Sequence, residues 1–190
     1  DQSKWTHEIG TGSQNNMWGW GNGELQYYQP QNSIVSNGTL KIIAKQEPQG
    51  LVDSWNNTYY YSSSRISTKN NFNFKYGKVE ARIKTLDGEG FWPAFWLLPK
   101  NGQWPCDGEI DIMEQWGRDT PTDETTGAAH IGSCANSYSN FQNFQTFSSS
   151  NYSSNFHIYS IIWEEDYIAW YVDGNKVFQV TPASFPTIPN

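Results

Sequence analysis

The segment 167–180 constrains the fold more than any other part of the sequence. It consists of two runs rich in β-branched and aromatic residues, 167–172 and 175–180, one on each side of Asp173-Gly174. Asp-Gly between two such runs is a strong local signal for a β-hairpin, because both residues tolerate the positive φ angles that a tight hairpin turn requires. We therefore expect a sheet built of hairpins in this part of the chain.

Similar patterns recur along the chain, and none of them has the period of a helix. The segment 77–84 alternates and predicts a half-buried strand. The segment 91–98 is apolar apart from Pro93, which predicts a strand buried on both faces. The other strand candidates are 39–45 after the turn Asn37-Gly38, then 65–69, 109–114, 127–131 and 156–163. Many short strands at close spacing predict an all-β fold, a sandwich or jelly roll of antiparallel sheets.

Composition narrows the ligand classes. The 190 residues suffice for a single domain, 1–190, and no linker or repeat divides them. Aromatic residues make up 16%, and the formal net charge is −7. An acidic chain does not favour nucleic acid, whose phosphates need a basic face. No apolar run reaches the ~18 residues of a membrane span. Aromatic faces and many neutral hydrogen-bonding groups suit a sugar ligand.

Two cysteines, Cys106 and Cys134, bear on the compartment. An even pair in an acidic chain rich in Asn, Ser and Trp favours an oxidising, extracellular or periplasmic setting, with the chain in its mature secreted form. If the strand of Glu109 pairs antiparallel with the strand of His130, the two cysteines fall near opposite positions and can form a disulfide. The alternative is two unlinked thiols.

The segment 109–114 carries three carboxylates among apolar residues. Because side chains alternate along a strand, Glu109 and Asp111 point to the same face, while Glu114 would point to the opposite one. A bulge that absorbs one residue near Ile112-Met113 would return Glu114 to the face of the other two. The spacing therefore predicts either a bulge there or no shared site.

The distances favour a shared site. With the bulge, four effective steps of ~3.3 Å separate the two Glu backbones by about 13 Å, and side chains that lean inward bring the carboxyl groups within roughly 5–6 Å. Retaining glycosidases hold their two carboxyl groups about 5–5.5 Å apart. Carboxylates so close do not all ionise easily, so at least one should have a raised pKa. The alternatives are a solvated strand face and a calcium site.

Aromatic residues precede the carboxylates. Trp92 and Trp96 are four residues apart and share a face in a strand, and Trp104 lies in a loop rich in Gly and Pro. Indole rings stack on the C–H faces of sugars, so all three are candidates for substrate binding. The alternative is that these tryptophans pack in the core. Trp104, in its loop, is the best of the three candidates for stacking on a sugar.

Further candidates for ligand contacts lie elsewhere in the sequence. The glycine-rich aromatic loop 17–28 contains Asn22 and Glu24. Arg65 could donate to a sugar hydroxyl; a surface position or an ion pair is the alternative. His130, in a run of small residues, could hydrogen-bond a catalytic carboxylate; a structural role is the alternative. No nucleophilic triad, phosphate loop or zinc spacing is present in the sequence.

These residues carry a resemblance to a known family. Glu109-Ile110-Asp111-Ile112-Met113-Glu114 resembles the bulged signature of glycoside hydrolase family 16, as in laminarinase-type endo-β-1,3-glucanases; the unbulged form belongs to lichenases. Nearly the whole chain takes part in the resemblance. Further laminarinase-like segments are 20–28, 64–69, 76–82, 92–96, the strand of His130 and the hairpin at Asp173-Gly174.

The resemblance implies a concanavalin-like β-jelly-roll with a concave cleft and a retaining mechanism that needs no cofactor. Glu109 would be the nucleophile, Glu114 the acid/base, and Asp111 would tune both. His130 matches a position that supports the acid/base. Contacts with the sugar or the cleft are implied for Asn22, Glu24, Arg65, Trp92, Trp96 and Trp104.

The chain departs from the family at its ends. The usual N-terminal strand with Trp-x-Asp-Glu-Phe and the usual C-terminal strands are not found in it. In the family those ends help to bind a structural calcium, for which only Gly38 matches a backbone ligand here.

We expect an endo-acting, retaining hydrolase of β-1,3-glucan or mixed-linkage β-1,3-1,4-glucan that acts as a monomer. The alternatives are a hydrolase of a galactan such as agarose or carrageenan, a non-catalytic β-glucan-binding protein, and a transglycosylase. Sulfated substrates would want more than the 12 Lys and Arg present. Binding proteins typically lose the catalytic carboxylates, and both Glu are present here.

Overall fold

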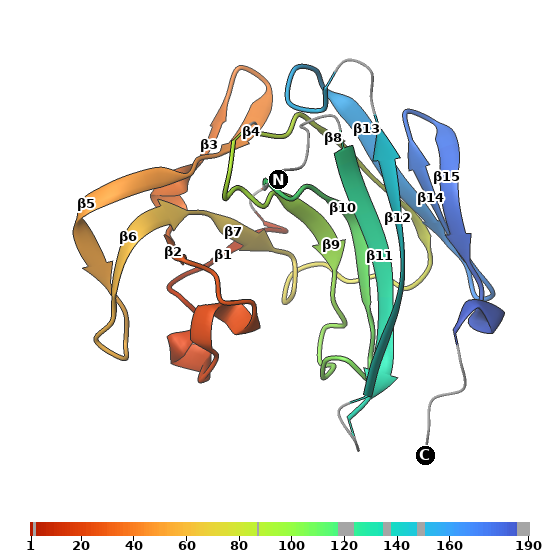
Figure 1. The fold of residues 1–190 in the computed structure, drawn as a ribbon, viewed down its shortest axis with the longest axis horizontal. Helices are drawn as coiled ribbons and strands as arrows, with labels where there is room; N and C mark the ends of the chain where they lie inside the picture. Colours follow the sequence, from red (N-terminus) through yellow and green to blue (C-terminus); the bar gives the residue numbers. More distant parts are fainter. Residues whose placement is uncertain (2, 87, 118–123, 135–137, 148–150, 186–190) are drawn as a thin grey trace. The chain divides into compact units, whose positions relative to one another are not determined.

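A computed structural model describes residues 1, 3–86, 88–117, 124–134, 138–147 and 151–185 (Figure 1). The chain forms two compact units, residues 1–73 and residues 74–190. Each is all-β within the described residues, with short 3₁₀ turns as its only helices. None of the described helices is long and apolar enough to cross a membrane. The single catalytic domain over 1–190 stays a prediction.

The unit 1–73 contains small sheets joined by short turns. In the described residues its sheets have the orders β1-β7, β2-β6-β5 and β3-β4. The strands are β1 (Thr6–Glu8), β2 (Gln26–Tyr28), β3 (Ser33–Ser36), β4 (Thr39–Ile42), β5 (Lys45–Val52), β6 (Thr58–Ser63) and β7 (Arg65–Ser67), and the 3₁₀ helices are η1 (Ser13–Asn15), η2 (Trp18–Gly21) and η3 (Pro30–Asn32).

The hairpin β3–β4 confirms the turn predicted at Asn37-Gly38. Both residues have positive φ angles, 51° and 74°, as a tight two-residue hairpin turn requires. One pairing differs from the antiparallel expectation, because β2 runs parallel to β6. The long connection through β3, β4 and β5 brings the chain back in the same direction, and a crossover of this length is what parallel pairing needs.

The unit 74–190 is a two-layer β-sandwich of antiparallel four-stranded sheets, with orders β12-β11-β10-β9 and β15-β14-β13-β8 (Figure 1). The predicted hairpin at Asp173-Gly174 joins β14 to β15, with φ angles of 50° and 79°. The strands are β8 (Gly77–Ile83), β9 (Ala94–Leu97), β10 (Glu109–Glu114), β11 (Glu124–Ser133), β12 (Tyr138–Phe147), β13 (His157–Trp163), β14 (Ile168–Val172) and β15 (Asn175–Val180), followed by η4 (Pro182–Ser184).

The core of this unit lies between its two sheets. Its largest fully buried side chains include Trp170 and Tyr159 from one sheet and Met113 from the other, each 1% exposed. The rest of the buried cluster is Ile112, Ala129, Tyr152, Ile161 and Val180. Apolar side chains of two facing sheets that interdigitate in this way drive the sandwich together.

The segment 91–98 does not match its prediction. Only Ala94–Leu97 forms a strand, and Trp92 and Leu98 are exposed by 39% and 49%. The prediction of burial on both faces was wrong because β9 is the last strand of its sheet in the described part of the chain. The half-buried strand predicted at 77–84 is confirmed by β8, whose inward residues alternate with exposed ones.

Candidate active site

A bulge interrupts strand β10. The pairing of β10 with β11 matches Asp111 to Ala128 and then Glu114 to Thr126, so three steps on one strand face two on the other. The register with β9 also shifts, between Asp111 and Met113. This confirms the bulge predicted near Ile112-Met113, which returns Glu114 to the face of Asp111.

Two residues that the sequence did not single out, Trp170 and Gly127, contact the backbone of the bulge. The Trp170 indole N–H of the opposite sheet donates to the backbone carbonyl of Asp111 at 2.9 Å. This carbonyl lies at the start of the bulge, and the indole gives it a hydrogen-bond partner. On β11, Gly127 lies where a Cβ would meet the Asp111 carbonyl oxygen at 2.9 Å and the Phe144 ring at 2.7 Å. Only glycine fits so close to the bulged backbone.

The four predicted catalytic residues lie together on β10 and β11. Glu109 pairs directly with His130 across the two strands. His130 Nε2 lies 2.9 Å from Asp111 Oδ2, and Asp111 is only 3% exposed. Asp111 therefore sits between the two glutamates and is held by an imidazole.

The pKa values of Glu109 and Glu114 differ from those of ordinary glutamates. Burial, together with the nearby Asp111 charge, raises the pKa of Glu109 to about 7 and the pKa of Glu114 to about 7. The hydrogen bond to Asp111 raises the pKa of His130 against the opposing effect of its own burial. The predicted raised pKa is therefore found at both glutamates, and a carboxyl group of this kind is able to donate a proton near neutral pH.

Three tryptophans surround the carboxylates. The Trp92 indole N–H donates to Glu114 Oε1 at 2.8 Å. Trp104, 56% exposed, hydrogen-bonds Glu109 and opposes the rise of its pKa. Trp96 pairs directly with Asp111 across β9 and β10, on the same face. All three sequence candidates thus lie beside the carboxylates, and their contact with a sugar stays a prediction.

The remaining predicted contacts lie in the unit 1–73. Glu24 accepts hydrogen bonds from Asn22 Nδ2 at 3.2 Å, from Gln26 Nε2 at 2.8 Å and from the Tyr28 hydroxyl at 2.5 Å. Burial and the Glu24 carboxylate raise the pKa of Tyr28, so this hydroxyl keeps its proton. Asn22 and Glu24 therefore share one polar network with two neighbours that the sequence did not single out.

Arg65 belongs to the same unit. Its guanidinium forms an ion pair with Glu8 across β1 and β7 and lies 4.5 Å from the centre of the Trp20 ring. The sequence offered an ion pair as the alternative to a sugar contact, without naming the partner. Glu8 lies 57 residues away from Arg65 in the sequence, so only the pairing of β1 with β7 brings the two together.

Cys106 and Cys134 form a disulfide, with their Cα atoms 5.3 Å apart. The strands of Glu109 and His130 are antiparallel neighbours, and each cysteine lies a few residues beyond this matched pair. The disulfide therefore ties the loop before β10 to the end of β11.

Gly38 is exposed at the turn of the β3–β4 hairpin. A calcium ion takes six to eight oxygen ligands, usually with several carboxylates. Among the residues that the structure describes, no group of three or more His, Cys, Asp or Glu is arranged to hold a metal ion. A calcium site around Gly38 therefore stays a prediction, and no step below depends on one.

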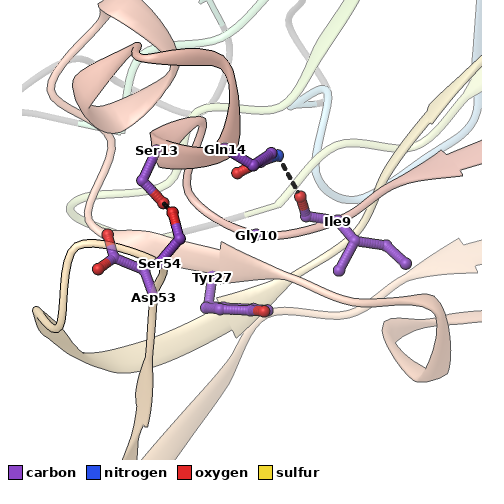
Figure 2. A pocket seen from close by; sticks show the side chains of 7 residues that line it. All are labelled: Ile9, Gly10, Ser13, Gln14, Tyr27, Asp53 and Ser54. Carbon is purple, nitrogen blue, oxygen red and sulfur yellow. Dashed lines mark hydrogen bonds between the residues drawn. The ribbon is translucent and has the colours of Figure 1, made fainter.

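The unit 1–73 also contains a pocket of about 260 Å³ (Figure 2). Asp53 at its wall accepts hydrogen bonds from Thr11 Oγ1 and from the backbone N–H groups of Trp55 and Asn57. Burial opposes its ionisation, but these bonds lower its pKa. Asp53 therefore stabilises the β5–β6 turn. The lining residues are Ile9, Gly10, Ser13, Gln14, Tyr27, Asp53 and Ser54.

Comparison with known proteins decides the family. The sequence profile of Glycosyl hydrolases family 16 matches residues 13–190. The chain belongs to this family. The fold agrees with the family, because the laminarinases among the solved structures similar to this chain are jelly rolls.

Among the relatives of this family 16 chain is glucan endo-1,3-beta-glucosidase A1 of Niallia circulans, 40% identical over 95% of the chain. The chain spans only 27% of the length of that protein. The laminarinase catalytic domain of Thermotoga maritima is 39% identical, with a TM-score of 0.84, over 97% of this chain and 73% of the other. The endo-beta-1,3-glucanase of Pyrococcus furiosus is 36% identical, with a TM-score of 0.85, over 97% and 70%.

Proposed function

We propose that this chain carries the catalytic machinery of an endo-acting, retaining hydrolase of β-1,3-glucan, with mixed-linkage β-1,3-1,4-glucan as the second substrate. The bulge in β10 is the observation that carries the proposal, because it gathers Glu109, Asp111 and Glu114 on one face. The likeness to endo-1,3-glucanases from three organisms supports the choice of linkage.

Each carboxyl group has a part in the proposed reaction. Glu109 attacks the anomeric carbon as a carboxylate, and Glu114 donates its proton to the leaving glycosidic oxygen. Glu114 then removes a proton from the water that hydrolyses the glycosyl-enzyme. The raised pKa of Glu114 keeps the acid protonated near neutral pH. Burial is the main cause of this raised pKa, and Asp111, held by His130, adds to it through its nearby charge.

The aromatic surround supports an extended sugar ligand. Trp92 and Trp104 are exposed by 39% and 56%, and they hydrogen-bond Glu114 and Glu109, respectively. The C–H faces of glucose units stack on such rings. For Asn22, Glu24 and Arg65, in the unit 1–73, polar contacts with a sugar stay a prediction from the sequence.

The test is the variant Glu109→Gln, assayed for sugar release from laminarin, lichenan, agarose and carrageenan. We expect the parent chain to act on laminarin or lichenan, and the variant to lose at least about 10³-fold in kcat while it still binds glucan. Glu80→Gln is the matched control, since Glu80 is 44% exposed and paired with Lys78. Full activity of Glu109→Gln would refute the nucleophile.

Product stereochemistry gives an independent test of the mechanism. A retaining enzyme releases the β-anomer first, which proton NMR detects before mutarotation. Release of the α-anomer would refute a covalent intermediate at Glu109. Predominant release of agarose or carrageenan oligosaccharides would favour the galactan alternative, and binding without hydrolysis would favour a non-catalytic glucan-binding protein.

We further propose that the protein works as a secreted monomer. The disulfide between Cys106 and Cys134 supports an oxidising compartment, because cytosolic thiols are kept reduced. Detection of the protein in culture medium or periplasm, with both cysteines inaccessible to a thiol reagent, is the expected result. Free thiols in the native protein would refute this assignment.

A further inference from the structure

Trp116 follows the bulged strand and shares the face of the catalytic carboxylates. Beyond β10 the backbone continues to pair with the segment before β9: the N–H of Gln115 donates to the carbonyl of Pro93 at 3.1 Å, and the N–H of Gly117 donates to that of Phe91 at 2.7 Å. This register places Trp116 directly opposite Trp92. Since Trp116 lies two residues after Glu114, the bulge that turns Glu114 to this face also turns Trp116.

The two indoles pack against each other. The ring centres of Trp92 and Trp116 are 4.2 Å apart and their planes make an angle of 27°, which is a stacked arrangement. Trp116 Nε1 donates to Thr126 Oγ1 at 3.3 Å, and Thr126 is the residue that faces Glu114 across β10 and β11. Trp116 is thus held on one side by Trp92 and on the other by β11.

The backbone around Trp116 leaves it little freedom. A Cβ on Gly117 would lie 2.3 Å from the Gly88 carbonyl oxygen and 2.7 Å from that of Phe91, so only glycine allows this close pairing. Gly90 donates a further backbone hydrogen bond to Gly117. Trp116 therefore projects from a fixed segment, and its ring is a rigid support for the indole of Trp92.

We propose that Trp116 is a positioning residue for the acid/base: by stacking on Trp92 and bonding Thr126, it holds the Trp92 indole N–H on the Glu114 carboxyl. This inference rests on the proposed function of Glu114. The Trp92 N–H lies 2.8 Å from Glu114 Oε1 and donates a hydrogen bond to it. Without its support the Trp92 ring can turn away from this position.

The charges around Glu114 give the direction of the effect. Asp111 acts on it from its own strand and opposes its ionisation, while His130 on β11 and the Trp92 hydrogen bond favour ionisation. Glu109 lies on the far side of Asp111, and β9 has no charged residue. Loss of the Trp92 bond removes a group that stabilises the carboxylate, so Glu114 then keeps its proton to higher pH.

The experiment compares Trp116→Leu, which removes the ring, with Trp116→Phe, which keeps a ring for stacking. For Trp116→Leu we expect the alkaline limb of the pH–kcat profile to move to higher pH and kcat on laminarin to fall about 10-fold, with KM changed less than about 3-fold. Trp116→Phe should stay within about 3-fold of the parent. Trp5→Leu, at an exposed tryptophan of the other unit, is the control.

A second measurement does not need activity. The titration of Glu114, followed by carbon NMR of labelled carboxyl groups in the free protein, should move to higher pH in Trp116→Leu and, by a smaller amount, in Thr126→Val. An unchanged titration and pH profile in Trp116→Leu, or a change in KM alone, would overturn the inference. If the parent chain hydrolyses no glucan, the proposed function fails, whereas the NMR titration still decides the role of Trp116.

Discussion

The substitution Glu114→Gln should stabilise the folded chain at alkaline pH although it removes the proposed acid/base. Burial and the charge of Asp111 raise the pKa of Glu114 from 4.5 to about 7. Because the pKa is higher in the folded chain, the contribution of Glu114 to stability is fully present below pH 4.5 and is lost as the pH rises through about 7. Glutamine keeps an oxygen for the Trp92 N–H and carries no charge.

The size of the effect follows from the same pKa. At 1.36 kcal/mol per pKa unit, the difference between 4.5 and about 7 is about 3 kcal/mol. Glu114 keeps contact with solvent, which screens its charge, so roughly half of this, ~1.5 kcal/mol, should appear in the free energy of unfolding. For a chain of this length that is ~3–6 °C in Tm.

The assay is urea unfolding, followed by tryptophan fluorescence, of the parent and Glu114→Gln at pH 8.5 and at pH 4.5. We expect the variant to be more stable at pH 8.5 and equal to the parent at pH 4.5. Glu80→Gln, at a largely exposed glutamate, should change the free energy of unfolding by less than about 0.5 kcal/mol at either pH. A gain that is the same at both pH values, or a loss at pH 8.5, would refute the reasoning.

Two further predictions concern the pH profile and the disulfide. In the proposed mechanism the reaction requires ionised Glu109 and protonated Glu114, and burial near Asp111 raises both pKa values to about 7. The plot of kcat/KM against pH should therefore be bell-shaped with its maximum near pH 7, and a flat profile between pH 5 and 9 would contradict this. Cys106→Ser with Cys134→Ser opens a loop of sequence separation 28 and should lower the free energy of unfolding by about 3–4 kcal/mol in urea; a loss under about 1 kcal/mol would contradict the entropic account.

Local rules were enough for the strands and the bulge. The alternation in 77–84 and the Asp173-Gly174 turn depend on neighbours in sequence, and both appear in the structure as predicted. The spacing of Glu109, Asp111 and Glu114 required a bulge for a shared site, because side chains alternate with a period of two. The residues of these motifs also placed the chain in its family.

Local rules failed where the outcome depends on a neighbouring strand. The apolar segment 91–98 gave no sign that, among the described residues, its strand would be the last of its sheet, since burial on the second face depends on what lies beyond it. The ion pair of Arg65 with Glu8 joins residues far apart in sequence, and no periodicity encodes it.

The sequence by itself determined the strand pattern, the need for a bulge and the set of carboxylates, because these follow from residue types at short, regular spacing. Only the tertiary structure decided which residues contact that bulge and which residues pack around Glu114. Trp170 reaches the Asp111 carbonyl from the opposite sheet, and Trp116 stacks on Trp92 through the register of two separate segments. Contacts of this kind depend on which faces are buried together. Local sequence does not determine them, because the free energy of burial depends on how all the strands pack in the complete fold.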